Sequence, residues 1–342
     1  MKDLWITISV GFLLILSIII LKSIAPSLFP LHFVYLVFAI LAFWFFSQIR
    51  FDIISLFSKH LYIISVVLLV FTLIIGQVTR GTIRWIPIGP LSLQPAEFVR
   101  PLLLVFFANY LTSSEITFKK LLKALGLLLI PAFLILVQPS LSVAILTVVG
   151  FFGVLISSNF NKKYILGGLV VVALLIPLFW QVMAPYQKER ILSFMNPSAD
   201  PLGAGYNSLQ STIAAGAGKL TGRGLGRGIQ TQLAFLPEKQ TDFIFAAVSE
   251  ELGFIGAGLM LAATFAILLR LIKFIENSIS PAGRAYISGF FLVYLLQVFI
   301  HVGMNLGMLP ITGLPFPLVS AGGSSLLATM IGLGIALGAY KK

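Results

Sequence analysis

The chain contains 342 residues, of which 58% are hydrophobic and only 10% are charged, and its mean hydropathy is +1.04. Soluble globular proteins carry about 25% charged residues, so this composition excludes a water-soluble enzyme. Cysteine is absent, which excludes disulfides, thiolate nucleophiles and cysteine-ligated metal centres. The three histidines, His32, His60 and His301, lie far apart and lack the spacing of a metal site. The composition therefore predicts a polytopic membrane protein.

Charge-free intervals outline ten hydrophobic spans, because a helix needs about 20 mostly apolar residues to cross the hydrocarbon core. The first span is interpreted as a retained helix, since no small-residue cleavage site of a signal peptide follows it. The expected fold class is an all-α polytopic membrane protein, a single transmembrane domain of residues 1–342. The ten spans are expected at residues 4–21, 31–49, 60–79, 95–112, two within 124–161, 164–183, 242–272 and two within 285–340.

The basic residues are distributed unequally between the two sides of the membrane, and this asymmetry predicts the orientation. With the N-terminus inside, the cytoplasmic side collects 13 of the 23 basic residues, whereas the short outer loops hold only Lys22, Arg80 and Arg84. Both termini are therefore expected in the cytoplasm, and residues 184–241 form one long extracytoplasmic loop between the seventh and eighth spans. The net charge of +12 follows largely from this rule, which favours contact with anionic membrane lipid over nucleic-acid binding.

A glycine-rich run at residues 216–228 of the long loop alternates glycines with Lys219, Arg223 and Arg227. It has neither the spacing of a Walker loop nor a true G-x-G-x-x-G. Two interpretations remain open. The run is either a flexible loop or a cradle in which backbone N–H groups and three cations bind a phosphate or pyrophosphate.

Three acidic residues lie at the beginning of the eighth span. Asp242 is either a functional acid or a residue that stabilises the helix N-terminus, where Thr241 can serve as the cap. Glu250 and Glu251 follow inside the span, where acids are costly and are functional candidates by default. Helical geometry separates Asp242 from Glu250 by roughly 12 Å along the axis. Paired glycosidase carboxylates are only roughly 5–9.5 Å apart, so sugar chemistry here would use a single carboxylate.

Polar residues also accompany the fourth span and two breaks in hydrophobic sequence. Glu97 and Arg100, three residues apart, share one helix face and either form a structural ion pair or line a polar cavity. The breaks at residues 138–140 and 320–325 fall at membrane depth, where irregular backbone is tolerated only if it is buried in protein or lines a cavity. Three glycines of the last span, Gly332, Gly334 and Gly338, indicate close helix packing.

The order of these motifs resembles the shape, elongation, division and sporulation (SEDS) family, the RodA/FtsW polymerases of bacterial cell-wall synthesis. Residues 310–315 (PITGLP) and 228–233 (GIQTQL) are more similar to the RodA branch than to the FtsW branch. The matching segments run from the third span to the last, in family order: 81–86 (GTIRWI), 94–97 (QPAE), 138–141 (QPSL), 186–191, 205–211 (GYNSLQS), 236–245 (LPEKQTDFIF), 250–253 (EELG) and 313–325 (GLPFPLVSAGGSS).

The resemblance implies a peptidoglycan glycosyltransferase of the bacterial cytoplasmic membrane that polymerises lipid II, with undecaprenyl pyrophosphate as the leaving group. Asp242 would be the general base that takes the proton from the 4-hydroxyl of the acceptor sugar. Glu97 and Arg100 match the family's cavity pair, with Arg in place of Lys, and Glu250 and Glu251 would be supporting acids. A divalent cation, Mg²⁺ or Mn²⁺, would help to hold the pyrophosphate. The side chains expected to bind the substrate and its pyrophosphate are those of Lys219, Arg223, Arg227, Arg190 and Ser324.

The chain departs from the family pattern at two positions. Ser140 stands where the family usually has Asp, and Gln240 replaces the common His two residues before the catalytic Asp. Neither departure removes the proposed base. A lipid II flippase and a division-specific polymerase of the FtsW type are the alternative functions. The motifs crowd on the outer side, whereas a flippase needs binding groups on both faces, so an enzyme is favoured.

The resemblance also implies a partner protein, a class B penicillin-binding protein that acts as the transpeptidase. The chain has no Ser-x-x-Lys nucleophile in a folded outer domain, so its glycan strands would otherwise remain uncrosslinked. A lipid-facing groove of small residues would accept the partner's transmembrane helix, or the same residues pack internally. The candidates are Gly256, Ala257, Gly258, Ala262, Ala263 and Gly289.

Overall fold

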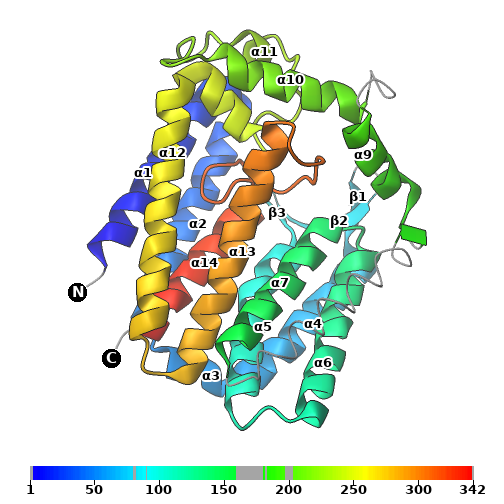
Figure 1. Ribbon diagram of the computed structural model, residues 1–342, viewed down its shortest axis with the longest axis vertical. Coiled ribbons are helices and arrows are strands. Elements are labelled where there is room, and N and C mark those ends of the chain that lie inside the picture. Colours follow the sequence, from blue (N-terminus) through cyan, green and yellow to red (C-terminus); the bar gives the residue numbers. More distant parts are fainter. Residues whose placement is uncertain are drawn as a thin grey trace.

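The computed structural model describes residues 3–79, 82–89, 91–158, 180–181, 183–196 and 203–340, and most of them are helical (Figure 1). The elements occur in this order: α1 (Leu4–Ile24), the short 3₁₀ helix η1 (Pro26–Leu28), α2 (Phe29–Gln48), α3 (Phe51–Leu56), α4 (Ser58–Ile75), β1 (Gln77–Thr79), β2 (Thr82–Ile88), β3 (Leu91–Leu93), α5 (Pro95–Thr112), α6 (Phe118–Val137), α7 (Leu141–Ser157), α9 (Pro185–Met195), α10 (Ala204–Ala217), α11 (Ile229–Gln232), α12 (Ile244–Asn277), α13 (Pro281–Asn305) and α14 (Gly323–Tyr340).

Seven helical segments in the described part of the chain are long and apolar enough to cross a membrane. They are α1, η1 with α2, α4, α6, α12, α13 and α14, and α7 is a shorter apolar helix. The expected seventh span, residues 164–183, lies almost entirely outside the described residues. The multi-pass membrane character is therefore confirmed, and the total of ten spans remains a prediction.

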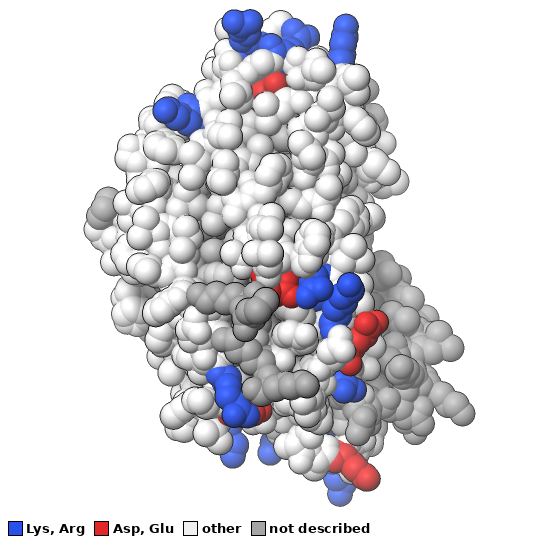
Figure 2. Space-filling view, turned by 90° about the vertical axis from the view of Figure 1, so that its left-hand side faces the viewer, with Lys and Arg blue, Asp and Glu red and all other residues white. Residues whose placement is uncertain are grey.

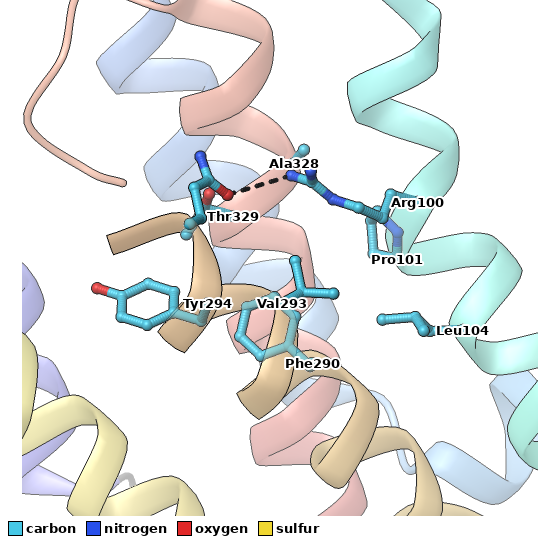
Figure 3. Close-up of a pocket in the computed structure, with 9 residues that line it drawn as sticks. Arg100, Pro101, Leu104, Phe290, Val293, Tyr294, Ala328 and Thr329 are labelled. Carbon is cyan, nitrogen blue, oxygen red and sulfur yellow. Dashed lines mark hydrogen bonds between the residues drawn. The ribbon is translucent and has the colours of Figure 1, made fainter. Parts of the chain in front are cut away.

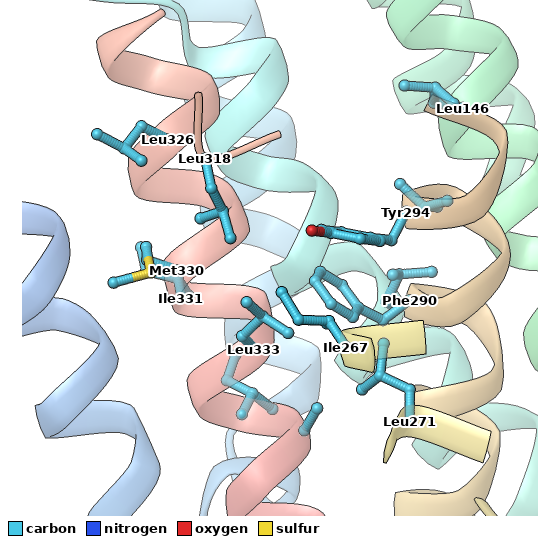
Figure 4. Packing of buried hydrophobic residues seen from close by; sticks show 14 of the residues in the cluster. Leu146, Ile267, Leu271, Phe290, Tyr294, Leu318, Leu326, Met330, Ile331 and Leu333 are labelled. Atoms are coloured by element: carbon cyan, nitrogen blue, oxygen red, sulfur yellow. The ribbon is translucent and has the colours of Figure 1, made fainter. Parts of the chain in front are cut away.

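Helix α14 lies in the middle of the bundle, between α2 and α13 (Figure 1). Its glycines allow this close approach, as predicted. A Cβ atom at Gly332 would lie 2.1 Å from the Phe290 ring, and one at Gly338 would lie 2.2 Å from the carbonyl oxygen of Ile49. Figure 4 shows Phe290 and Tyr294 of α13 directed toward α14. Small residues thus replace side-chain bulk where helices must touch through their backbones.

A small antiparallel sheet departs from the all-α expectation. Its strands have the order β1-β2-β3, with Gln77 opposite Trp85 and Ile86 opposite Leu93. The third span consequently ends at Ile75 rather than at residue 79. Strand β2 contains the β-branched and aromatic residues that favour extended structure. Charge and hydropathy show only that this segment connects two spans, so they cannot reveal its pairing.

The two chain ends lie on the same half of the molecule, away from α9, α10 and α11 (Figure 1). The side chains of Asp3 and Arg270 form an ion pair that joins the start of α1 to α12. On the face drawn in Figure 2, charged side chains gather at the top and in the lower part, and an uncharged belt separates them. This distribution is what a bilayer-spanning protein needs, because charges are costly in hydrocarbon.

We predict that the half with α9–α11 is extracytoplasmic and that the half with the termini is cytoplasmic. A topology reporter inserted after Ala184 or near Lys219 should report an extracytoplasmic position. The same reporter fused after Lys342 should report a cytoplasmic one, because the positive-inside asymmetry orients the short loops. A cytoplasmic signal from the Lys219 insertion would contradict both the orientation and the placement of the candidate site.

Candidate active site

Asp242 lies in a turn just before α12, and not inside the helix as expected. The helix begins at Ile244, and its N-cap residue Phe243 makes no side-chain capping bond. The hydroxyl group of Thr241 donates instead to Glu238, so the predicted Thr241 cap is wrong. The N–H groups of Thr241, Asp242 and Phe243 all point at the carbonyl oxygen of Glu238, at 3.1, 3.0 and 3.3 Å. The Asp242 residue is half-buried in this compact turn.

Donors from two distant parts of the chain hold the same turn. Asn305 ends α13, and Ser320 and Ala321 belong to the irregular segment before α14. The carbonyl oxygens of Gln240, Thr241 and Asp242 accept hydrogen bonds from Ala321 N at 2.8 Å, Ser320 Oγ at 2.8 Å and Asn305 Nδ2 at 2.9 Å, respectively.

The loop at residues 310–317 closes against the Asp242 carboxylate. Gly313 has a φ of 72°, and a Cβ atom there would lie 3.7 Å from Asp242 Oδ2. The exposed Arg190 side chain of α9 donates to the carbonyl oxygen of Ile311 at 3.4 Å. The fold therefore brings Arg190 and Asp242, 52 positions apart in the chain, to two sides of one loop.

The glycine-rich run packs tightly against α12 where that helix bends at Gly253, which has φ 69° and ψ −168°. A Cβ atom at Gly218 would lie 1.7 Å from the carbonyl oxygen of Ser249, and one at Gly222 would lie 2.2 Å from that of Glu251. At these two positions the run packs against α12 instead of standing free, and glycine is needed because any side chain would separate the two backbones.

Three backbone N–H groups of this run donate to acceptors on α12. Arg223 N and Gly224 N donate to the carbonyl oxygens of Glu250 and Glu251, and Gly226 N donates to Glu251 Oε1 at 3.2 Å. A phosphate cradle built from these amides is thus excluded. The side chains of Lys219, Arg223 and Arg227 are exposed. They remain available as cations.

Glu250 and Glu251 are completely buried and act as acceptors for neighbouring segments. Glu250 accepts the N–H groups of Gln230 and Thr231, at 2.9 and 3.0 Å, at the start of α11. Glu251 accepts Ser23 Oγ at 2.6 Å and Gln232 Nε2 at 2.9 Å. Such bonds stabilise ionised carboxylates in a buried position. The two supporting acids therefore connect α1, α11 and α12.

Lys239 lies beside this pair of acids. Its ammonium group donates to the carbonyl oxygen of Thr231. Burial lowers the pKa of Lys239, and the negative charges of Glu251 and Glu250 oppose that shift. The lysine thus supplies a positive charge close to two buried negative ones, on the segment that leads into the Asp242 turn.

Glu97 and Arg100 form the structural ion pair that their spacing allows. Arg100 Nη2 lies 2.7 Å from Glu97 Oε2, and the two side chains are only 5% and 4% exposed. The same guanidinium nitrogen lies 3.5 Å from Gln297 Oε1 (Figure 3). Arg100 also lines a small pocket with Leu104, Tyr294 and other residues of α5, α13 and α14. The two residues form a structural ion pair, of which Arg100 lines the pocket.

The two predicted breaks are buried in protein, as irregular backbone at membrane depth requires. Gln138 is fully buried, and its Nε2 atom donates to the carbonyl oxygen of Leu69 at 2.9 Å. Ser140 Oγ accepts from Gln94 Nε2 at 3.4 Å. Ser324 is 1% exposed, and its Oγ atom accepts from Gln94 N at 2.8 Å. In this structure Ser324 joins α14 to the start of α5.

No group of three or more His, Asp or Glu side chains that could hold a metal ion occurs in the described ranges. The protein side chains placed here do not build a metal cage on their own. Magnesium is typically held by one or two carboxylates together with substrate phosphates. Asp242 would supply one carboxylate to such an ion, and phosphate oxygens of the substrate would supply other ligands.

Sequence reasoning missed the polar face of α13. Gln297, His301 and Asn305 recur every four residues in an apolar helix, so they share one face. Gln297 Nε2 donates to the carbonyl oxygen of Pro315 at 2.9 Å, and His301 Nδ1 bonds that of Leu314 at 2.7 Å. This spacing was a usable signal. Polar residues inside a membrane span are rare and mark functional or structural contacts.

The chain is similar to several known proteins. A family model covering FtsW, RodA and SpoVE, described as "Cell cycle protein", matches residues 2–342. The peptidoglycan glycosyltransferase MrdB of Escherichia coli K12 is 38% identical over 284 residues, which is 82% of this chain and 76% of MrdB. The probable peptidoglycan glycosyltransferase FtsW of Aeromonas salmonicida is 34% identical over 341 residues, which is 96% of this chain and 86% of that protein.

Two solved structures share the fold. A chain from work titled "Structural coordination of polymerization and crosslinking by a peptidoglycan synthase complex" superposes with a TM-score of 0.87 at 30% identity, covering 99% of this chain and 97% of that one. The rod shape determining protein RodA of Thermus thermophilus gives a TM-score of 0.74 at 27% identity, covering 99% and 96%. Because the family model spans nearly the entire chain and the fold is RodA-like, this protein belongs to the FtsW/RodA/SpoVE family, the SEDS family.

Proposed function

We propose that this chain polymerises lipid II into glycan strands and that Asp242 is the general base. The chain is a peptidoglycan glycosyltransferase and a multi-pass protein of the bacterial cytoplasmic membrane. One observation carries the assignment of the base. Asp242 stands half-buried beside the 310–317 loop, whereas Glu250 and Glu251 are fully buried acceptors and Glu97 is paired with Arg100.

In the proposed reaction the 4-hydroxyl oxygen of the acceptor sugar attacks the anomeric carbon of the polyprenyl-linked glycan. The bond from that carbon to the pyrophosphate oxygen breaks, and its electron pair leaves with the pyrophosphate. The hydroxyl proton passes to the carboxylate of Asp242. A positioned base of this kind contributes about 10²–10⁴-fold to a rate. The leaving group is already a good one, so a single base suffices for an inverting transfer.

Negative charge develops on the pyrophosphate, and cations placed where that charge appears stabilise the transition state. Arg190 is the best placed of the candidates, because it contacts the same loop that closes against Asp242. Lys219, Arg223 and Arg227 are exposed cations of the segment between α10 and α11, and these helices lie at the same end of the molecule as α9 (Figure 1). A divalent cation bound to the pyrophosphate would add charge neutralisation, and Mg²⁺ and Mn²⁺ are the candidates.

One experiment distinguishes the proposed polymerase from a lipid II flippase. Purified protein should convert labelled lipid II into glycan chains that lysozyme digests, without any second membrane protein. The same protein in sealed vesicles should not move labelled lipid II between leaflets. Lipid transport without chain formation would reverse the assignment. The placement of Asp242, Arg190 and the 310–317 loop at one end of the bundle supports the enzyme.

An elongation role is proposed over a division role. The curated relatives include both MrdB and FtsW proteins at similar identity, so identity alone does not separate the two. The RodA-like form of residues 228–233 and 310–315 favours elongation and cell shape. Depletion of the protein in its host should then produce rounded cells, whereas a division role would produce filaments.

A class B penicillin-binding protein is the proposed partner, and one related solved structure concerns a complex that coordinates polymerisation with crosslinking. The packing of two candidate residues argues against their lining the predicted groove. A Cβ atom at Gly289 would lie 2.8 Å from the carbonyl oxygen of Gly150, so Gly289 packs internally against α7, and Ala257 is buried. Gly258 has open space around it, and Ala262 is exposed. The groove candidates on α12 are thus Gly258, Ala262 and the half-buried Ala263.

We predict that Ala263→Trp weakens association with the transpeptidase. The indole would fill the space that small residues leave for a partner helix. Co-purification from native membranes measures the association, and Leu129→Trp, at an exposed position on α6, is the control. Equal recovery of the transpeptidase with both variants would place the groove elsewhere.

A further inference from the structure

The turn that carries Asp242 contains a residue in an unfavourable conformation and leads into a helix without a local cap. Glu238 has a φ of 49°, in the left-handed region that a glutamate rarely adopts, and α12 lacks a side-chain cap at its start. Residues in such conformations persist only where the surrounding structure holds them. The carbonyl oxygens of Gln240, Thr241 and Asp242 accept hydrogen bonds from donors elsewhere in the chain.

Asn305 supplies the missing side-chain cap of α12 and a hydrogen bond to the main chain of Asp242. Its Oδ1 atom accepts the N–H of Ala246 at 3.0 Å, which is a bond that an N-cap side chain normally makes. Its Nδ2 atom donates to the carbonyl oxygen of Asp242 at 2.9 Å and to that of His301, one turn back in α13, at 2.8 Å. The residue is completely buried. One amide thus caps α12 from another helix and holds the main chain of Asp242.

Ser320 makes the second connection. Its hydroxyl group donates to the carbonyl oxygen of Thr241 at 2.8 Å and accepts the N–H of Phe316 at 2.8 Å. It therefore links the Asp242 turn to the end of the 310–317 loop. The residue is 3% exposed, so water does not compete readily for these bonds.

We propose that Asn305 and Ser320 are positioning residues that set the place of the Asp242 carboxylate relative to the 310–317 loop. The proposal rests on the role of Asp242 in the proposed function. A misplacement of about 1 Å costs on the order of 10²-fold in rate, even when the mutation lies away from the chemistry. Neither side chain needs to touch the substrate for this effect.

The first test is Asn305→Leu, which keeps the size of the side chain and removes both the Oδ1 acceptor and the Nδ2 donor of the amide. We expect kcat for lipid II polymerisation to fall by roughly 100-fold, with little change in KM, because the base is displaced and the binding cations are not. Asn109→Leu is the matched control. Asn109 also donates across segments, to Ser58 Oγ at 2.8 Å and to the carbonyl oxygen of Ser55 at 3.3 Å, but far from Asp242.

Ser320 gives a second pair of variants in case Asn305→Leu does not fold. Ser320→Ala should lower kcat by about tenfold because it removes the buried hydrogen bonds to Thr241 and Phe316, and Ser320→Thr should restore most of the rate because it keeps the hydroxyl group. Ser65→Ala is the control, since the Ser65 hydroxyl donates only within its own helix, to the carbonyl oxygen of Leu61 at 2.7 Å. Wild-type kcat in Ser320→Ala would overturn the proposal.

A double variant separates this proposal from the proposed function. If Asn305 acts through Asp242, then Asn305→Leu should change the residual rate of the Asp242→Asn protein by less than about twofold. An undiminished loss in that background would overturn the positioning role. Full activity of Asp242→Asn alone would instead overturn the base assignment. Loss of activity in Asp242→Asn with wild-type kcat in Asn305→Leu would leave the base in place and reject the positioning role.

Discussion

Asp242→Asn is expected to insert and fold normally and to lose glycan polymerisation by about 10²–10⁴-fold. The amide keeps the size of the side chain, and the main-chain carbonyl of Asp242 still accepts from Asn305. The amide cannot take the proton from the acceptor hydroxyl, so the reaction loses its base. The measurement is the single-turnover rate of chain formation from labelled lipid II by purified protein.

Asp52→Asn is the control for this experiment. It makes the same chemical change at an exposed acid of α3, near the end of the molecule that carries the termini. The control should polymerise like the parent protein, and both variants should melt at the same temperature as the parent. Polymerisation by a correctly inserted Asp242→Asn protein at close to the parent rate would exclude Asp242 as the base.

Gly253→Ala is expected to destabilise the protein strongly. Gly253 has φ 69° and ψ −168°, a conformation that is essentially restricted to glycine and costs other residues about 1–3 kcal/mol. The added Cβ atom would also lie 2.2 Å from Gly222 N and 2.5 Å from the carbonyl oxygen of Leu220. Overpacking of this kind costs a further ~1–3 kcal/mol. Thermal unfolding in detergent should show a lower transition temperature and a poorer yield of folded protein.

Gly258→Ala provides a matched control five residues further along the same helix. A Cβ atom there meets nothing within 4 Å, so alanine should be neutral or stabilise the helix by up to about 1 kcal/mol. Similar melting temperatures for the two variants would mean that the backbone contact between α12 and the glycine-rich run does not carry stability. Both substitutions add the same methyl group, so the contrast measures the combined effect of the backbone contact and the positive φ at Gly253.

Composition and charge determined the class of this protein, since lipid-facing helices need apolar side chains and anionic membranes retain cationic loops. The motif order indicated the family, and the comparisons confirm it. Local spacing was also enough to predict the ion pair of Glu97 and Arg100, because residues three apart lie on the same face of a helix whatever surrounds them. The packing role of Gly332 and Gly338 followed from the same kind of local argument.

Tertiary structure alone decided which partners the other polar groups found. The sequence marked Glu250 and Glu251 as costly acids, but only the fold shows that they accept hydrogen bonds from Ser23 and from residues near α11. The tertiary structure likewise places Asp242 in a turn before α12. Asn305, 63 positions away in the chain, holds that turn. A buried polar group needs a hydrogen-bond partner, and the sequence can indicate which groups have that need. The donor that meets it is chosen by how helices distant in the chain come together, which periodicity and hydropathy do not encode.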